Sequence, residues 1–133
     1  IIKQNEAETA AALGYEKLAD GDIEQAGFAL LKRLDAKALL LTRGAQGMNL
    51  FESNRVMTHI PVANVSEVYD VSGAGDTVVA VIALALSAGV PLTEAARLAN
   101  IAAGVVVRKF GTATTTVDEL GEAMEQIAAG EAI

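Results

Sequence analysis

The chain has 133 residues, of which 52% are hydrophobic, and this length provides one domain with a substantial core rather than two domains. Its formal net charge of −7 at pH 7, without a run of Lys or Arg, argues against binding to nucleic acid or to an anionic membrane surface. The absence of cysteine excludes disulfides, thiol catalysis and thiolate metal sites, and agrees with a reducing, cytoplasmic location.

The first third of the chain predicts two helices followed by a buried strand. Residues 5–18 are rich in Ala and Glu, and a second helix is expected over residues 22–34 with Asp22 as its N-cap. Residues 37–42 form an almost continuous apolar run before a glycine-containing turn, which indicates a strand buried on both faces of a parallel sheet. The pattern favours a single α/β domain over residues 1–133.

Two short strands are expected next, over residues 48–52 and 55–62. Ser53 and Asn54 between them give a hairpin-like signal, and Pro61 suits an edge strand. Residues 65–69 then lead into a glycine-rich turn.

The helix predicted over residues 74–88 is apolar almost all round, so it is expected to be central and buried, and Gly89 and Pro91 end it. Its apolar run, residues 78–86, is far shorter than the roughly 18 residues of a membrane-spanning helix. The chain also shows no charged-then-apolar leader, so neither secretion nor membrane insertion is expected.

Two further helices are predicted in the last third of the chain. One covers residues 92–108, with Thr93 or its neighbour as cap, and the other covers residues 117–129, where Thr116 and Glu119 form a capping box. Small residues give the first of these helices a face for close packing: Ala95, Ala96, Ala99, Ala102 and Ala103.

The strongest chemical signal is the turn that precedes the helix at residue 74. Gly73, Ala74 and Gly75 allow a phosphoryl oxygen to approach backbone N–H groups at a helix N-terminus, where the helix dipole favours negative charge. Asp76, in the first turn, is placed to act as a general base. The alternative is a simple tight loop followed by an ordinary first-turn acid.

Two weaker signals lie earlier in the chain. Thr42, Gly44 and Gly47 follow the predicted buried strand, and ligands of open α/β sheets bind beyond the carboxyl ends of strands. Asn5 and Glu8 are one helical turn apart and could share a water-coated magnesium ion. A plain turn and a solvated helix start are the respective alternatives.

Two familiar nucleotide-binding motifs are absent. A P-loop requires a glycine followed by lysine, and no glycine of this chain is followed by lysine. The dinucleotide fingerprint would begin at Gly73 and Gly75 but meets Val78 where the third glycine is required.

Taken together, the motifs resemble those of the ribokinase-like (PfkB) carbohydrate kinases. Asn5 and Glu8 match N-x-x-E, residues 42–47 match T-x-G-x-x-G, and residues 70–76 match D-x-x-G-A-G-D, in the order of that family. The resemblance implies a ribokinase-like, three-layer α/β fold. Residues 67–78 and 103–112 are most similar to the heptose 7-phosphate kinase branch, which supplies precursors of the lipopolysaccharide inner core, and Tyr69, Val71 and Val78 carry this narrower assignment.

The resemblance also implies roles for these residues in transfer of a phosphoryl group from ATP to a phosphorylated sugar. Asp76 would take the proton of the sugar's anomeric hydroxyl, and the backbone amides of Gly73, Ala74 and Gly75 would stabilise the transferring phosphoryl group. The remaining implied sites are Thr42, Gly44, Gly47, Asn100, Gly111 and Thr112 for the nucleotide, Asn5 and Glu8 for water-mediated Mg2+, and Asp70 with the Ser72 carbonyl for K+.

Family members are substantially longer than this chain, which begins without an initiator methionine. The sequence is therefore expected to represent the carboxy-terminal, nucleotide-binding half of a kinase, which alone binds nucleotide weakly and does not phosphorylate sugar. A nucleotidyltransferase domain fused downstream, as in some heptose kinases, stays open. So do two alternatives: another ribokinase-like sugar or nucleoside kinase, and a non-catalytic module that forms homo-oligomers through an exposed strand at residues 39–41.

Overall fold

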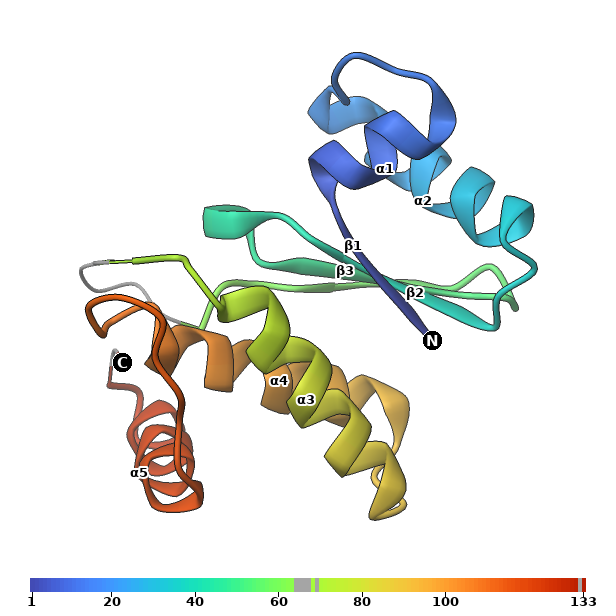
Figure 1. The fold of residues 1–133 in the computed structure, drawn as a ribbon. Coiled ribbons are helices and arrows are strands. Elements are labelled where there is room, and N and C mark those ends of the chain that lie inside the picture. Colours follow the sequence, from blue (N-terminus) through green and yellow to red (C-terminus); the bar gives the residue numbers. More distant parts are fainter. Residues whose placement is uncertain (64–67, 69, 132) are drawn as a thin grey trace. The chain divides into compact units, whose positions relative to one another are not determined.

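The computed structural model describes residues 1–63, 68, 70–131 and 133. These residues form two compact units, Ile1–Ile60 and Pro61–Ile133 (Figure 1), and each unit is treated by itself below. The expectation of a single domain over residues 1–133 stays a prediction. The predicted segment 65–69 lies outside the described residues except for Val68, which is exposed.

The first unit is a four-stranded mixed sheet with two helices. The sheet order is β1-β2-β3-β4, in which β1 and β2 are parallel and the other neighbouring pairs are antiparallel. In Figure 1 the two helices lie together on one side of this sheet. The elements are β1 (Ile2–Asn5), α1 (Glu6–Leu13), the 3-10 helix η1 (Asp20–Asp22), α2 (Ile23–Arg33), β2 (Ala38–Thr42), the 3-10 helix η2 (Gly44–Gln46), β3 (Met48–Glu52) and β4 (Met57–Ile60).

The predicted second helix and the three predicted strands are confirmed within a few residues, and three other expectations need correction. The strand β1 was not predicted, because a four-residue segment with one apolar side chain gives no alternating pattern. The helix α1 ends at Leu13 rather than near Leu18, because Gly14 adopts a left-handed φ of 81° and caps it. Finally, β2 is buried as expected but in a mixed sheet, and it pairs with β1 and β3, so residues 39–41 are not an exposed edge.

The core of the first unit lies between α2 and the sheet. Leu30, Leu39 and Phe51 are fully buried, and the ring of Phe51 meets that of Phe28 edge-on at a centroid separation of 5.2 Å. The aromatic ring of Phe51 also lies directly against Gly27 on α2, where a Cβ atom would overlap the ring. A glycine at this position therefore sets how closely the helix can approach the sheet.

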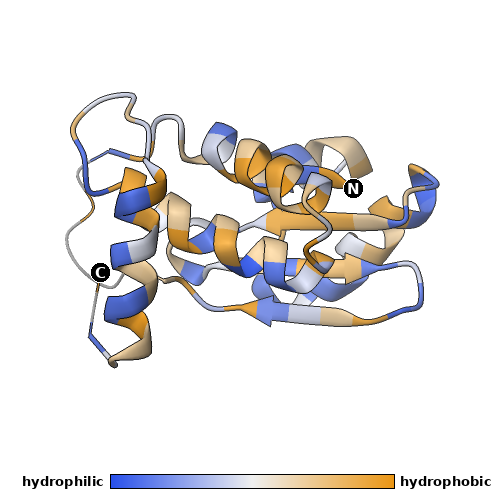
Figure 2. Ribbon diagram, turned by 90° about the horizontal axis from the view of Figure 1, so that it is seen from below, coloured by the Kyte–Doolittle hydropathy of each residue, from blue (hydrophilic) through white to orange (hydrophobic). Residues whose placement is uncertain are grey.

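The regular structure described in the second unit consists of helices: α3 (Ala74–Ser87), α4 (Leu92–Val106) and α5 (Val117–Ala128). The predicted capping box of α5 is confirmed: the Thr116 side chain accepts a hydrogen bond from the Glu119 N–H, and the Glu119 carboxylate accepts one from the Thr116 N–H. Polar and apolar residues alternate along α5, next to the C-terminus in Figure 2, as expected for an amphipathic helix. The small residues expected to pack on α4 are fully buried at Ala95, Ala96, Ala99 and Ala102.

Two expectations for the second unit are wrong. The helix α3 is not buried all round, because only Val78, Ile82 and Ala85 are buried, whereas Leu84 is 72% exposed. The helix α4 has Pro91 at its N-cap position and no side-chain cap, so Thr93 lies inside the first turn. No helix in the described part of the chain combines the length and hydrophobicity that crossing a bilayer requires.

Candidate functional site

The parallel pairing of β1 and β2 brings two of the predicted motifs together in the first unit. Asn5 and Thr42 are register partners at the carboxyl ends of these strands. The N-x-x-E motif therefore begins beside the T-x-G-x-x-G motif, at the edge where α/β sheets bind ligands. A cleft of about 450 Å³ lies here, lined in part by Asn5, Thr42 and Gly44.

Asn5 and Glu8 form a reciprocal capping box at the start of α1. Asn5 Oδ1 accepts a hydrogen bond from the Glu8 N–H at 2.8 Å, and Glu8 Oε2 accepts one from the Asn5 N–H at 2.7 Å. The predicted spacing thus has a structural role, since it satisfies N–H groups that the helix leaves unpaired. The described residues include no group of three His, Cys, Asp or Glu that could hold a metal ion, and water-mediated Mg2+ at Asn5 and Glu8 stays a prediction.

The loop after β2 is closed by its own backbone. The Arg43 N–H donates to the Gly47 carbonyl at 2.8 Å, and the Gly47 N–H donates to the Gly44 carbonyl at 3.1 Å. Gly44 and Gly47 have φ values of 53° and 78°, in the left-handed region that favours glycine. The two glycines of T-x-G-x-x-G are thus required by the shape of the loop.

In the second unit, the turn before α3 leaves a helix N-terminus open. Gly73 is the N-cap residue with a φ of 82°, and no side chain caps the helix. The first intrahelical bond runs from the Thr77 N–H to the Gly73 carbonyl at 3.0 Å, and the Ala74 N–H donates to the Val71 carbonyl at 3.3 Å. The N–H groups of Gly75 and Asp76 therefore have no acceptor within the helix. The Asp76 carboxylate in this turn is exposed and makes no hydrogen bond or ion pair with the described residues.

Asp70 fixes the shape of this turn. Its Oδ1 accepts a hydrogen bond from the Ser72 N–H at 2.8 Å, and its own N–H donates to the Val107 carbonyl at 3.3 Å. The hydrogen bonds from the backbone and side chain of Ser72, together with one from the Gly111 backbone, lower the pKa of the Asp70 carboxyl. The carboxylate is therefore held in its ionised, hydrogen-bond-accepting form.

The loop between α4 and α5 lies against the same turn. A Cβ atom added at Gly73 would meet Cγ2 of Thr112 at 3.2 Å, and the Gly111 backbone helps to lower the pKa of the Asp70 carboxyl. The second unit therefore brings together Asp70, Ser72, Gly73, Gly111 and Thr112, which the sequence had indicated separately.

The motifs at the ends of β1 and β2 and in the turn before α3 agree with comparisons to known proteins. The family model described as pfkB family carbohydrate kinase matches residues 1–119 of the chain. The chain belongs to the PfkB family. The bifunctional protein HldE of Methylococcus capsulatus is 53% identical over 105 residues, which cover 79% of this chain and 22% of that protein. HldE of Coxiella burnetii (strain Dugway 5J108-111) is 46% identical over 129 residues, which cover 97% of this chain and 27% of that protein.

Solved structures confirm the ribokinase-like α/β fold. Ribokinase of Arabidopsis thaliana, complexed with ribose and ATP, matches 93% of this chain and 40% of its own length, with a TM-score of 0.83 and 27% identity. Phosphofructokinase-2 of Escherichia coli, in complex with potassium, matches 96% of this chain and 41% of its own length, with a TM-score of 0.83 and 21% identity. This PfkB chain thus spans about a quarter of the curated relatives' length and about two fifths of the solved structures.

Asn100, like Thr42, is a predicted nucleotide residue whose side chain makes a hydrogen bond within the fold. It is 7% exposed on α4, and its Nδ2 donates to the Pro61 carbonyl at 2.7 Å. This hydrogen bond holds the start of the second unit against α4. A position near the adenine, as in the PfkB resemblance, stays a prediction for this residue.

Arg43 was not predicted, although it lies inside the PfkB nucleotide loop. Its Nε donates to Glu6 Oε1 and its Nη2 donates to Asp20 Oδ1, both at 2.6 Å, and its side chain is only 11% exposed. These two carboxylates tie the loop to the start of α1 and to η1 and neutralise the guanidinium. Nothing local in the sequence indicates these partners, because they lie 37 and 23 residues away.

The pKa of Asp70 provides a direct test of the turn geometry. The carboxyl is expected to titrate below its ordinary value of 3.8, because hydrogen bonds from Ser72 and Gly111 stabilise the charged form. Because the pKa of Asp70 is lower in the folded chain than in the unfolded chain, the ionised carboxylate stabilises the turn at pH values above the unfolded-state pKa. This stabilisation is lost as the pH falls through the folded-state pKa. NMR titration of the Asp70 carboxyl carbon measures it, and an unshifted pKa would contradict the turn as described.

Proposed function

We propose that this chain forms the nucleotide-binding part of a kinase that transfers the γ-phosphoryl group of ATP to the anomeric hydroxyl of heptose 7-phosphate. The observation that carries the proposal is the open N-terminus of α3, where Gly73 precedes an uncapped first turn that holds the exposed Asp76 carboxylate. Membership in the PfkB family and the relatives named bifunctional protein HldE support it.

Each group of the turn has a distinct task in this proposal. Asp76 accepts the proton of the sugar hydroxyl while that oxygen forms a bond to the γ-phosphorus and the bond to the bridging oxygen of ADP breaks. We assign the backbone N–H groups of Gly73, Ala74 and Gly75 to the oxygens of the transferring group, where negative charge must be stabilised. The resulting products are the sugar 1,7-bisphosphate and ADP.

The remaining contacts to ATP are assigned to residues of each unit. Thr112 lies against Gly73, and the neighbouring Gly111 backbone helps to lower the pKa of Asp70, so we assign both residues to the nucleotide. Thr42, Gly44 and Gly47 are assigned to the triphosphate and ribose from their place at a strand's carboxyl end.

The ions of the proposed reaction would be held at two places. Asn5 and Glu8 would hold Mg2+ through water, because each already uses one side-chain oxygen in the capping box. Bound there, the ion would neutralise phosphate charge. Asp70 and the Ser72 carbonyl are the proposed K+ ligands, and the Asp70 carboxylate is ionised and accepts the Ser72 N–H.

We assign the sugar specificity of the proposed kinase to other parts of a longer polypeptide; this chain spans about a quarter of the length of its curated relatives. We therefore propose that this chain alone binds Mg-ATP weakly and does not turn over heptose 7-phosphate. A cytoplasmic location, a role in lipopolysaccharide synthesis and a fused nucleotidyltransferase domain belong to the same proposal. Self-association through the exposed apolar residues of α3, such as Leu84, is the alternative for the isolated chain.

Substitution Gly75→Val tests the phosphate role of the turn. The valine side chain is expected to keep phosphate oxygens from the backbone N–H groups and to weaken Mg-ATP binding by about 10- to 100-fold, as for the loss of one charge-assisted hydrogen bond. Calorimetric titration of the chain with Mg-ATP measures the change, and Asp76 is left in place.

Gly121→Val is the matched control, because Gly121 lies in α5 with open space around the position of a Cβ atom. It makes the same change in another helix and is expected to leave Mg-ATP binding unaltered. Equal affinities for the unaltered chain and Gly75→Val would overturn the assignment of this turn to phosphate.

A further inference from the structure

The loop that carries Gly111 and Thr112 is closed at its base by one lysine. Lys109 Nζ donates to the Thr114 carbonyl and to Glu119 Oε1, both at 2.7 Å. The Lys109 backbone N–H also donates to the Val106 carbonyl at 3.0 Å, so the residue extends the last turn of α4. The lysine therefore connects a fixed helix end to the far side of the loop.

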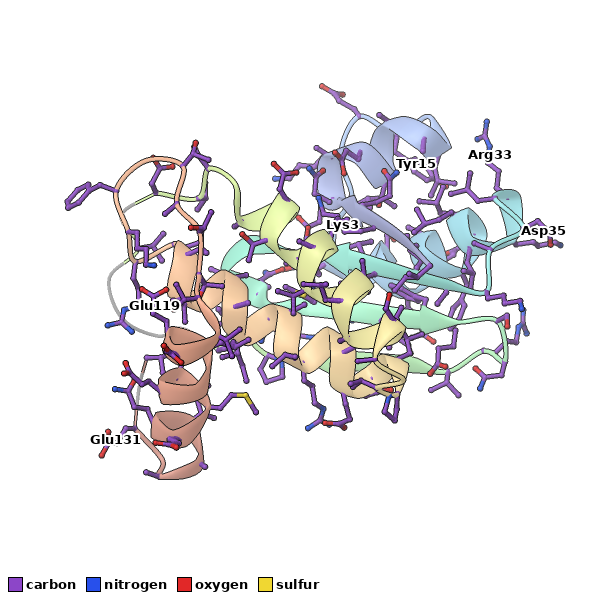
Figure 3. The ribbon with its side chains drawn as sticks, turned by 60° about the horizontal axis from the view of Figure 1, so that its bottom comes forward. Lys3, Tyr15, Arg33, Asp35, Glu119 and Glu131 are labelled. Atoms are coloured by element: carbon purple, nitrogen blue, oxygen red, sulfur yellow. The ribbon has the colours of Figure 1, made fainter. Side chains whose placement is uncertain are left out.

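Glu119 holds the other end of the same loop. It lies at the start of α5, at the base of the loop that joins α4 to α5 (Figure 3). One carboxylate oxygen accepts the hydrogen bond from Lys109, and the other accepts the Thr116 N–H at 2.8 Å. The side chains of Lys109 and Glu119 are 33% and 37% exposed, so water screens this pair less than a fully exposed one.

The tip of this loop reaches the turn before α3. Thr112 lies against Gly73, and the Gly111 backbone beside it helps to lower the pKa of Asp70. Gly111 has a φ of 70°, so the loop turns sharply at that residue. A loop released at Lys109 would lose the support that keeps these two residues beside the turn.

We propose that Lys109 and Glu119 are positioning residues for nucleotide binding, which hold residues 110–116 so that Gly111 and Thr112 form a wall of the phosphate-binding turn. The inference rests on the proposed function, and it adds a role for two side chains that do not themselves contact the nucleotide. Their effect is exerted on affinity for ATP and not on proton transfer by Asp76.

The test is the variant Lys109→Met, which keeps the length of the side chain and removes its donors. Hydrogen exchange of residues 110–116 is expected to accelerate in the nucleotide-free chain, and the dissociation constant for Mg-ATP is expected to rise by about three- to tenfold. Lys109→Arg keeps donors for both partners and is expected to restore most of the affinity. Glu119→Gln keeps the capping box while weakening the contact with Lys109, so it is expected to give an intermediate loss.

Arg97→Met is the charge control, because among the described residues Arg97 forms only an exposed pair with Glu94 on α4, at 3.8 Å with side chains about 60% exposed. It removes the same charge and is expected to leave both measurements unchanged. Equal exchange or equal affinity in Lys109→Met and the unaltered chain overturns the inference, and so does an equal loss in Arg97→Met. Failure of the proposed function is distinguishable, because it shows as absence of Mg-ATP binding by the unaltered chain.

Discussion

Substitution of Asp76 by asparagine is expected to lower kcat for sugar phosphorylation by about 10²- to 10⁴-fold, the usual contribution of a general base. The amide keeps the size of the side chain but accepts no proton at neutral pH. Affinity for Mg-ATP is expected to be equal or higher, because a negative charge is removed beside the phosphates. The assay is steady-state phosphorylation of heptose 7-phosphate by a polypeptide of the relatives' length that contains this sequence, with calorimetry for the nucleotide.

Asp118→Asn provides the matched control for this variant. Asp118 is an exposed acid in the first turn of α5, as Asp76 is in the first turn of α3, so the two substitutions have similar effects on charge and helix dipole. The control is expected to keep full kcat. A kcat for Asp76→Asn close to that of Asp118→Asn would contradict the assignment of Asp76 as the base.

Gly27→Ala is expected to lower the free energy of unfolding by about 1–3 kcal/mol, the usual range for an overpacked core. A Cβ atom at this position would overlap the ring of Phe51, which is fully buried and held edge-on against Phe28. Because Phe51 is enclosed by the core between α2 and the sheet, its ring cannot move aside without disturbing that packing. Urea unfolding followed by circular dichroism measures the change.

The sign of the effect makes Gly27→Ala informative. In the interior of an unconstrained helix, a change from glycine to alanine stabilises by about 0.5–1 kcal/mol. Gly121→Ala meets that condition, since open space surrounds the added atom on α5, and it is expected to raise stability. A stabilised Gly27→Ala variant would show that the helix retreats from Phe51 at little cost.

Elements with local signals could be predicted from the sequence. The capping box at Thr116 and Glu119 is confirmed, because both partners lie within one helical turn and satisfy each other. The strand β2 and the helix α2 are confirmed in the same way, from a continuous apolar run and from a helical pattern. The motifs at residues 42–47 and 70–76 identified the family for the same reason: their backbone requirements are contained in a few adjacent residues.

What the sequence did not predict depends on contacts between distant residues. The partners of Arg43 are set by the folding of α1 and η1 beside the loop, and the hydrogen bond from Asn100 to Pro61 spans 39 residues. Exposure of Leu84 was missed because an apolar composition predicts burial but cannot indicate which elements are available to cover it. The site assignments beyond these contacts stay predictions.

The junction between β1 and α1 also determines where this architecture can change in length. Asn5 ends the strand, pairs in register with Thr42 and caps the helix that begins at Glu6, so no residue is left over to act as a spacer. An inserted residue here would have to break either the strand register or the helix cap. Residues 14–17 are exposed and outside regular structure. Evolution can add or remove residues there while the pairing of Asn5 with Thr42 and the cap of α1 stay unchanged.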